Sequence, residues 1–455
     1  MPSASPSSPA SRRARAHPAA RRDVVRARWA ATLAFLTNGA MLGALIPHYP
    51  QAKAAFGLDA DAFGLLVVAL AAGAAATGSL PAPILRRWGS RRVMLAGTVV
   101  MAVVVVAAGL VVDLSAPAQG RPWAGAVWLF AALLGVAGIL DAVVDTAQNA
   151  QGLTVQTRLV RPVLTSMHAG WSLGAGLGAG LGALAVGAGM PAGLHLGLNG
   201  TVCVAVLVAA GRRFLPDDAR PAPDADAPEG TAAPAPGPSP ATPRAPSPAT
   251  PRAAAWLALL PVTVVAMAGF GVEEFGNAWT ALFLQSERGL DVAAAGLGAS
   301  TLLLAQFVGR LVGDRVLHRL GRRRTLAGSL TVVVAGLVLA LTAPAAPAVF
   351  AGLALAGLGC AVVVPTAYAL GDEVPGLPPR TGLAVVSWLM RVAGIGLSPL
   401  VGLLATGMPL AAALAVFPAL AALGLLGAWV LGRRRRSPAH RGRDTPPRPD
   451  ARGVS

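Results

Sequence analysis

Charged residues are scarce in this chain of 455 residues: they make up 13% of it, about half of what a soluble domain carries. The acidic ones are the scarcer, with 20 Asp and Glu against 37 Lys and Arg. Hydrophobic residues reach 55%, and the mean hydropathy is +0.62. This composition excludes an ordinary soluble domain and predicts a chain that is embedded in a membrane.

Cysteine is almost absent as well. Cys203 and Cys360 are the only two, and both lie within long apolar segments. They offer neither a disulfide framework nor the spacing of a metal site, so we expect no metal and no cofactor. The first apolar run is too long for a cleavable signal peptide, which predicts an uncleaved anchor.

Long apolar runs are what the chain has in abundance. A helix needs about 20 apolar residues to cross the hydrocarbon core of a bilayer. Segments of about that length predict an all-α membrane protein with about twelve transmembrane helices, at 28–47, 62–85, 93–113, 122–150, 163–188, 191–211, 255–284, 293–313, 325–343, 347–370, 382–404 and 408–431.

The net charge of +17 is unevenly distributed along the chain. Arginines cluster in an N-terminal tail (1–27), after the second and eighth predicted spans, and in a C-terminal tail (432–455), whereas the intervening loops carry almost none. An excess of Lys and Arg marks the cytoplasmic side of a membrane protein. We therefore expect a multi-pass protein of the bacterial inner membrane with both termini in the cytoplasm, and no nucleic-acid partner.

Residues 215–253 interrupt the apolar pattern, are rich in Pro and Ala, and contain "SPATPRA" twice. Such a composition cannot bury a core, which predicts a disordered cytoplasmic linker. The linker separates two predicted six-helix bundles, 28–214 and 254–431. The bundles resemble each other, because "TGSLPAPILRRWGSRR" (77–92) aligns without gaps with "GRLVGDRVLHRLGRRR" (309–324). Two parallel six-helix repeats predict a transporter with its binding site between the halves.

The second copy of this repeat resembles the loop signature that follows the eighth helix in the major facilitator superfamily. The residues that carry the resemblance are Gly309, Leu311, Gly313, Asp314, Arg315, Gly321, Arg322, Arg323 and Arg324. The first copy keeps Leu85, Arg87, Gly89, Arg91 and Arg92, but has Ala82 and Pro83 in place of the Asp and Arg. The resemblance implies that these loops gate the transport pathway, with Asp314 engaging arginines of its own loop in one gating state.

A narrower resemblance covers the fourth and fifth predicted spans. These spans resemble a pattern found in bacterial permeases akin to the fucose-permease branch. The residues that carry the resemblance are Asp145, Asn149, Gln151, Arg161, Pro162, His168, Trp171, Ser172 and Gly174. Gln156 stands where those relatives often have Glu. The resemblance implies a sugar-like polar solute.

Two acids lie inside the fourth span, in "GILDAVVDTAQNAQG" (138–152). At 100° per residue, Asp141, Asp145, Gln148 and Asn149 share one face of a helix. A charged Asp near the bilayer centre costs roughly 2.5–3.5 kcal/mol, so this face is predicted to point into the protein. Two interpretations stay open: a functional site, which we favour for Asp145, and hydrogen bonds that hold neighbouring helices together.

Other polar residues extend this set. His168, on the fifth span, is expected at the depth of Asp145, which makes a His–carboxylate pair plausible. Arg391 occupies the matching repeat position in the eleventh span, and an intramembrane Arg pairs with a carboxylate or binds an anionic substrate group. Glu273 and Glu274 lie deep in the seventh span. The small residues of "GAGLGAGLG" (174–182) predict a seam of close helix packing.

From these residues we predict a monomeric, proton-coupled secondary transporter that moves a small solute by rocking its two halves around a central cavity. The residues expected to line that cavity are Asn38, Asp141, Asp145, Asn149, His168, Trp171, Glu273, Asn277, Trp279 and Arg391. Asp145 or Glu273 would carry the proton. Two alternatives stay open: a pump of the same fold that expels apolar drugs, and a sensor or scaffold that transports nothing. An enzyme is disfavoured because the sequence shows no nucleophile–base or metal constellation.

Overall fold

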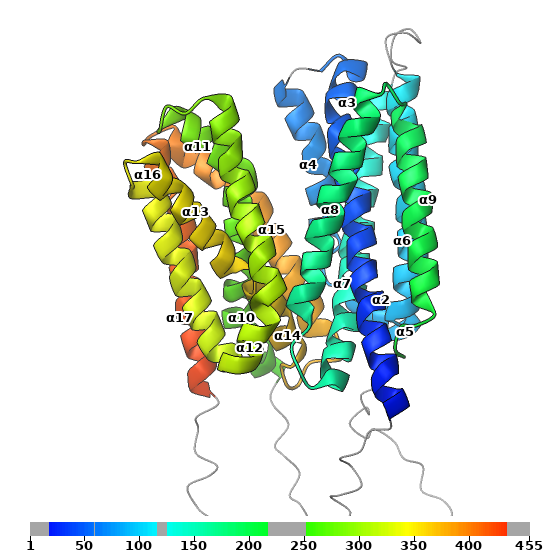
Figure 1. The fold of residues 1–455 in the computed structure, drawn as a ribbon, viewed down its shortest axis with the longest axis vertical. Helices are drawn as coiled ribbons and strands as arrows, with labels where there is room; N and C mark the ends of the chain where they lie inside the picture. Colours follow the sequence, from blue (N-terminus) through cyan, green and yellow to red (C-terminus); the bar gives the residue numbers. More distant parts are fainter. Residues whose placement is uncertain (1–17, 59, 116–124, 217–251, 435–455) are drawn as a thin grey trace, which may run out of the picture.

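The computed structural model describes residues 18–58, 60–115, 125–216 and 252–434. Within these ranges every regular element is a helix, arranged in two bundles that stand side by side (Figure 1). The predicted all-α class is confirmed. Both predicted tails and the predicted 215–253 linker fall largely outside the described residues.

The first half of the chain builds one bundle from apolar stretches separated by short polar or Gly-containing turns. Its elements are α2 (Pro18–Gly43), η1 (Ile46–His48), α3 (Tyr49–Phe56), α4 (Ala60–Ala76), α5 (Pro81–Trp88), α6 (Ser90–Leu114), α7 (Ala126–Leu159), α8 (Leu164–Gly187) and α9 (Ala192–Gly211). The fourth predicted span therefore continues past residue 150 to Leu159.

The second half builds the other bundle. Its elements are α10 (Arg252–Glu274), the π-helix η3 (Phe275–Trp279), α11 (Thr280–Ser286), α12 (Val292–Thr342), α13 (Ala346–Cys360), α14 (Val363–Asp372), α15 (Thr381–Ala405), α16 (Leu410–Ala413) and α17 (Val416–Arg434). Three of them, α10, η3 and α11, follow one another without a break and make up the seventh predicted span.

The described helices account for the twelve predicted spans. Ten of them are long and apolar enough to cross a membrane, and the pair Leu66–Ala76 and Pro81–Trp88, bent by 60°, makes an eleventh span. The longest helix, α12, is broken at Gly321, where φ is 75° and ψ is 158°. Division of α12 at this break gives the twelfth span, so the predicted fold class is confirmed.

The glycine at this break has a counterpart in the first half. Gly89 separates α5 from α6 with φ 77° and ψ 153°, almost the same backbone conformation as Gly321. This region of φ and ψ is essentially restricted to glycine. The two glycines also occupy equivalent positions in the ungapped alignment of 77–92 with 309–324. Each half therefore changes the chain direction between two consecutive helical segments with a glycine in the same backbone conformation.

Close helix packing in the first half depends on small residues, as the sequence predicted. An ideal Cβ added to Gly174 of α8 would lie 1.9 Å from the carbonyl oxygen of Leu36 on α2. A Cβ on Gly39 of α2 would lie 2.1 Å from the carbonyl oxygen of Trp171 on α8. The two backbones therefore approach each other as closely as small-residue seams allow.

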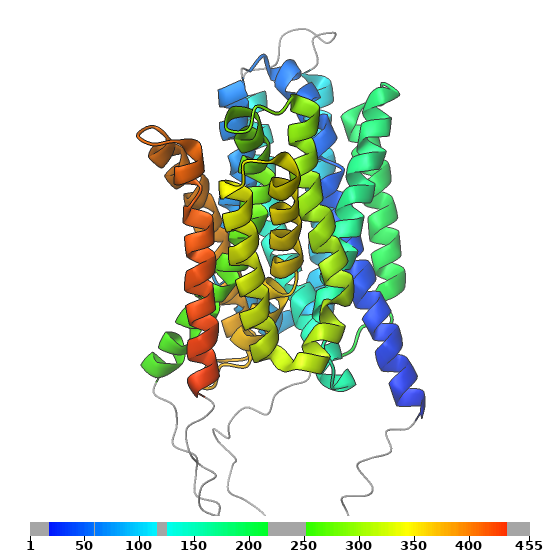
Figure 2. The same ribbon diagram turned by 60° about the vertical axis from the view of Figure 1, so that its left-hand side comes forward.

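The two halves are close together at one end of the molecule and apart at the other (Figure 1). The start of α2 and the end of α17 lie at the close end, as the rotated view also shows (Figure 2). We call it the basic end, because the exposed Arg87, Arg91 and Arg92 lie there with the Gly89 corner.

The apolar cores follow the same division. One cluster of buried residues contains side chains of both halves, such as Met167 and Met390. A second cluster belongs to the first half alone and includes Phe130, and a third belongs to the second half alone and includes Phe283. The halves thus share a core only where they meet, and each keeps a core of its own elsewhere.

The seam between α2 and α8 predicts a stability difference between two neighbouring glycines. A Cβ on Gly178 would lie 2.2 Å from the carbonyl oxygen of Ala40, so Gly178→Ala should force the helices apart and cost about 1–3 kcal/mol. The control, Gly180→Ala, places its Cβ in open space and should gain about 0.5–1 kcal/mol from helix propensity. Thermal unfolding in detergent measures both, and equal melting temperatures would contradict this account of the seam.

Candidate functional site

An arginine of the second half is held by two carboxylates of the first half. Asp141 and Asp145 lie one turn apart on α7, so both point to the same side of the helix. Arg391 of α15 reaches them with Nη1 at 3.1 Å from Asp141 Oδ2 and Nη2 at 3.1 Å from Asp145 Oδ2. The three side chains keep only 14–19% of their surface exposed. We call these three residues the Arg391 cluster.

Neighbouring amides orient the two carboxylates. Asn38 of α2 donates from Nδ2 to Asp141 Oδ1 at 3.0 Å, and Asn149 donates from Nδ2 to Asp145 Oδ1 at 3.0 Å. The other end of the Asn149 amide, Oδ1, lies 3.0 Å from His168 Nε2. Because that oxygen only accepts, His168 must carry a proton on Nε2. Asp145 and His168 are therefore linked through Asn149.

A second charged cluster lies on the other side of His168. Arg310 of α12 donates from Nη2 to Glu273 Oε1 of α10 at 2.5 Å and from Nη1 to Ser172 Oγ of α8 at 2.6 Å. Gln306, one turn before Arg310, donates to the same Glu273 oxygen at 2.6 Å. The Ser172 hydroxyl in turn donates to the carbonyl oxygen of His168 at 3.3 Å. We call Glu273, Gln306, Arg310 and Ser172 the Arg310 cluster.

Glu274 belongs to a smaller group within the second half. It accepts a hydrogen bond from the Ser398 hydroxyl of α15, and Trp279 donates from Nε1 to Ser398 Oγ at 3.1 Å. No described Lys, Arg or His lies within ion-pair distance of Glu274, in contrast to Glu273. Asn277, between Glu274 and Trp279, is exposed and lies in the π-helix η3.

Asp314 caps a helix of the opposite half. Its Oδ1 accepts from the Thr165 backbone N–H at 3.1 Å and its Oδ2 from that of Ser166 at 3.0 Å, at the start of α8. A carboxylate there satisfies unpaired N–H groups and the positive end of the helix dipole. A Cβ on Gly313 would clash with the Thr165 side chain, so this glycine allows the approach.

This contact corrects the expectation that Asp314 engages arginines of its own loop. Both carboxylate oxygens accept from backbone N–H groups of α8 instead. The reason is geometric, because α12 carries Asp314 toward the opposite half, whereas Arg315 and Arg323 are exposed. Ala82, the first-half equivalent of Asp314, is buried and has no carboxylate to offer.

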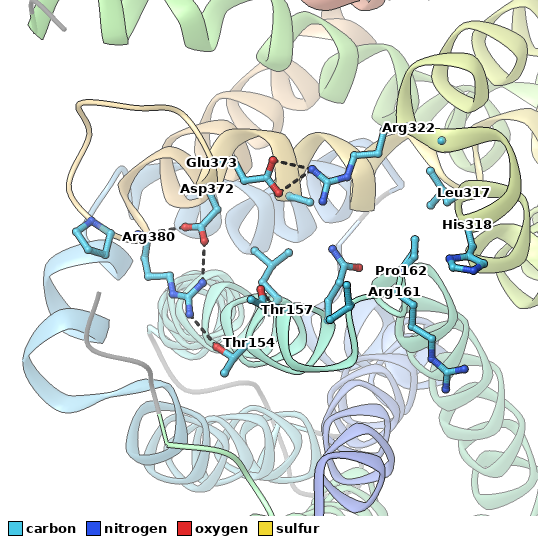
Figure 3. A pocket seen from close by; sticks show the side chains of 16 residues that line it. Thr154, Thr157, Arg161, Pro162, Leu317, His318, Arg322, Asp372, Glu373 and Arg380 are labelled. Atoms are coloured by element: carbon cyan, nitrogen blue, oxygen red, sulfur yellow. Dashed lines mark hydrogen bonds and ion pairs between the residues drawn. The ribbon is translucent and has the colours of Figure 1, made fainter. Parts of the chain in front are cut away.

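The basic end holds a cavity of about 590 Å³ that is lined by residues of both halves (Figure 3). Arg380, which precedes α15, binds Asp372 at 2.8 Å and donates to Thr154 Oγ1 of α7 at 2.8 Å. Next to Asp372, Glu373 accepts from Arg322 through both carboxylate oxygens at 2.7 Å (Figure 3). Two ion pairs within the second half therefore hold the cavity walls, and the hydrogen bond from Arg380 to Thr154 reaches across the halves.

Comparison with known proteins identifies the family of this fold. The model of the Major Facilitator Superfamily matches residues 30–273 and again residues 259–452, which together cover most of the chain. The chain belongs to the major facilitator superfamily. The first match covers the first half and runs on into α10, the second covers the second half, and the predicted family is confirmed.

Two bacterial relatives in this superfamily match most of the chain. An uncharacterized MFS-type transporter of Yersinia pestis is 27% identical over 356 residues, which covers 78% of this chain and 83% of the relative. An uncharacterized transporter, y4wD, of Sinorhizobium fredii is 26% identical over 379 residues, which covers 82% of this chain and 89% of the relative. The predicted assignment to a membrane transporter family is confirmed at this level.

Solved structures of the superfamily share the fold. The crystal structure of FucP in the outward conformation has a TM-score of 0.68 at 14% identity and covers 92% of this chain and 100% of that one. The proton:xylose symporter XylE has a TM-score of 0.63 at 12% identity, with 90% and 96% covered. At such low identity the likeness concerns the fold alone.

Within this superfamily fold, the predicted site residues fall into separate groups. Asn38, Asp141, Asp145, Asn149, His168 and Arg391 form one connected network. Glu273 lies in the Arg310 cluster, Trp279 in the Glu274 group, and Trp171 packs against the shared apolar core. Asn277 makes no hydrogen bond with a described residue. Their role in binding stays a prediction.

Arg310, Gln306 and Ser398 were not among the predicted site residues. Arg310 falls inside the apolar segment 293–313, so the rule that an intramembrane arginine needs an acidic partner, already applied to Arg391, would have selected it. Because Arg310 adjoins the loop signature, it was not treated as an intramembrane residue. Gln306 and Ser398 carry no signal of this strength, because single polar side chains are common in membrane helices.

The capping contact of Asp314 predicts a conformational shift in Asp314→Asn. The amide keeps one acceptor and turns an NH₂ group toward an N–H donor, so about 1–2 kcal/mol of inter-half stabilisation should be lost, a change of roughly 5- to 30-fold in the equilibrium between closed and open basic ends. Distances between spin labels on α8 and α12 at the basic end measure the shift. The control is Glu373→Gln, which removes an exposed ion pair within the second half. An unchanged distance distribution in Asp314→Asn would disprove the capping role.

Proposed function

We propose that this protein is a proton-coupled secondary transporter of a small polar solute, and that it works by alternating access. The basic end would face the cytoplasm, because arginines concentrate there. The conformation described here would then be outward-facing, with the halves joined at the basic end. The observation that carries the proposal is the Arg391 cluster, in which an arginine of one half pairs with two carboxylates of the other inside the membrane fold.

Beside the shared apolar core, the halves make polar contacts that involve α7, α8, α12 and α15. Asp314 and Arg310 of α12 bind α8, and Arg391 of α15 binds α7. Trp388, one turn before Arg391, donates from Nε1 to the carbonyl oxygen of Ala75 at 2.7 Å. Polar contacts of this kind can be exchanged for water when the basic end opens, whereas the separate apolar cores of each half stay intact.

Protonation of a carboxylate in the Arg391 cluster would favour that opening. Arg391 is held by two negative charges, and a proton on Asp145 removes one of them together with one charge-assisted acceptor. Loss of one member of a buried ion pair typically costs about 3–5 kcal/mol when nothing replaces it, but here Asp141 remains to hold Arg391. The proton therefore loosens the junction and leaves Arg391 partnered.

A polar solute fits the side chains around this cluster. Asn38, Asn149 and His168 supply amide and imidazole groups beside the two acids, and such groups hydrogen-bond hydroxyl-rich molecules. FucP and XylE are named as a fucose:proton symporter and a proton:xylose symporter, which agrees with a sugar-like solute in this chain. Protons and that solute would be its partners, with the protein acting as a monomer.

The proposal predicts different defects for the two acids. Asp145→Asn should abolish proton-driven accumulation but spare exchange of solute down its gradient, because Asp141 still holds Arg391. Asp141→Asn should reduce accumulation more mildly, since Asp145 remains to carry the proton. The solute is first chosen by a thermal-shift screen of the purified protein against sugars, organic acids and lipophilic cations. Solute uptake and solute-induced proton movement are then measured in proteoliposomes for the parent and both variants.

The outcomes separate the candidate functions. Unchanged coupling in Asp145→Asn would remove the proton from this residue and point to Glu273 or Glu274, of which only Glu273 has a described cationic partner. Stabilisation by lipophilic cations alone, with export rather than uptake, would favour the efflux pump. If no compound moves across the membrane with the parent protein, the transport proposal fails.

A further inference from the structure

A second cavity, of about 380 Å³, lies at the basic end on the junction between the halves. Four arginines line it. Arg28 comes from α2 and Arg161 from the turn before α8, whereas Arg315 and Arg319 lie one turn apart on α12. We call it the four-arginine cavity. Each half supplies two of these arginines.

Positive charge exceeds negative charge among the described residues of this cavity. Four arginines face one carboxylate, Asp314, whose two oxygens accept from the backbone of α8. Arg28 donates to the Ser166 hydroxyl at 3.0 Å, and it is attracted by Asp314 but repelled by Arg161 and Arg315. Within the described ranges none of the four arginines forms an ion pair. The cavity therefore attracts an anion.

The shape of the guanidinium selects among anions. Its planar fork matches the oxygen pairs of phosphate, and several arginines from different directions suit a group with three or four oxygens. Apolar side chains adjoin the cavity. Leu311, on its wall, is 50% exposed, and Pro162 lines it as well. A phosphate in the cavity can thus carry acyl chains that lie against these helices.

We propose that the four-arginine cavity binds a phosphate group, either of a phospholipid headgroup or of a free phosphate, and that the bound phosphate ties the two halves together at the basic end. Basic pockets between helices on the cytoplasmic side are suited to acidic headgroups. A phosphate bridging Arg28 or Arg161 to Arg315 or Arg319 cancels the repulsion across the junction. The site is separate from the Arg391 cluster, so the proposal does not depend on the transported solute.

The test is direct binding to the full-length protein in detergent, by native mass spectrometry and thermal shift. The probes are phosphatidylglycerol, phosphatidylcholine and inorganic phosphate. Arg161→Gln/Arg319→Gln removes one arginine from each half of the cavity. Arg212→Gln/Arg213→Gln is the control with the same loss of charge, because these two exposed arginines follow α9 outside the cavity.

We expect the cavity variant to bind phosphatidylglycerol about tenfold or more weakly than the parent, and the control to bind like the parent. A thermal shift with inorganic phosphate as well would identify a general phosphate site, whereas a response to phosphatidylglycerol alone would identify the headgroup together with its chains. Equal weakening in both variants would reveal a diffuse surface attraction and overturn the proposal. Parent protein that binds none of the probes, or binds phosphatidylcholine as tightly as phosphatidylglycerol, would overturn it too.

Discussion

The guanidinium of Arg391 imposes the constraint on which the junction between the halves depends. A positive charge at that position in an apolar helix needs a negative partner, because burial of an unpaired ion is far costlier than burial of a pair. The nearest carboxylates are not on α15 but on α7 of the other half. The second half therefore satisfies its own buried charge only when it docks on the first, and docking has an electrostatic reason beyond apolar contact.

Other polar groups near this cluster also find their partners in the opposite half. The start of α8 in the first half presents backbone N–H groups that Asp314 of the second half satisfies, and Thr154 of α7 accepts from Arg380. In each case one half holds a polar group that is complete only with the other. Such contacts are specific in register yet exchangeable with water, which suits an interface that must form and break repeatedly. The apolar clusters confined to one half supply the permanent stability.

The sequence predicted the fold well because the fold depends on local patterns. Apolar run lengths predicted the spans, and the ungapped repeat aligned Gly89 with Gly321, which share one backbone conformation in the structure. The site was predicted less completely, since it depends on how helices rotate and dock. The similar depth of Asp145 and His168 made a His–carboxylate pair plausible, and the helices place the Asn149 amide between the two side chains. The partners of Asp314 lie on the opposite half, and nothing in its local sequence specifies that surface.

The single-residue corner at Gly321 has a mechanical consequence for α12. The helical segments before and after it are joined without any intervening loop, so the joint has almost no slack. When the segment before Gly321 moves away from α8, the segment after Gly321 must move with it. Asp314 lies two helical turns before Gly321, on the first of these segments. A shift of α12 where Asp314 contacts α8 is thus passed directly to the helical segment beyond Gly321.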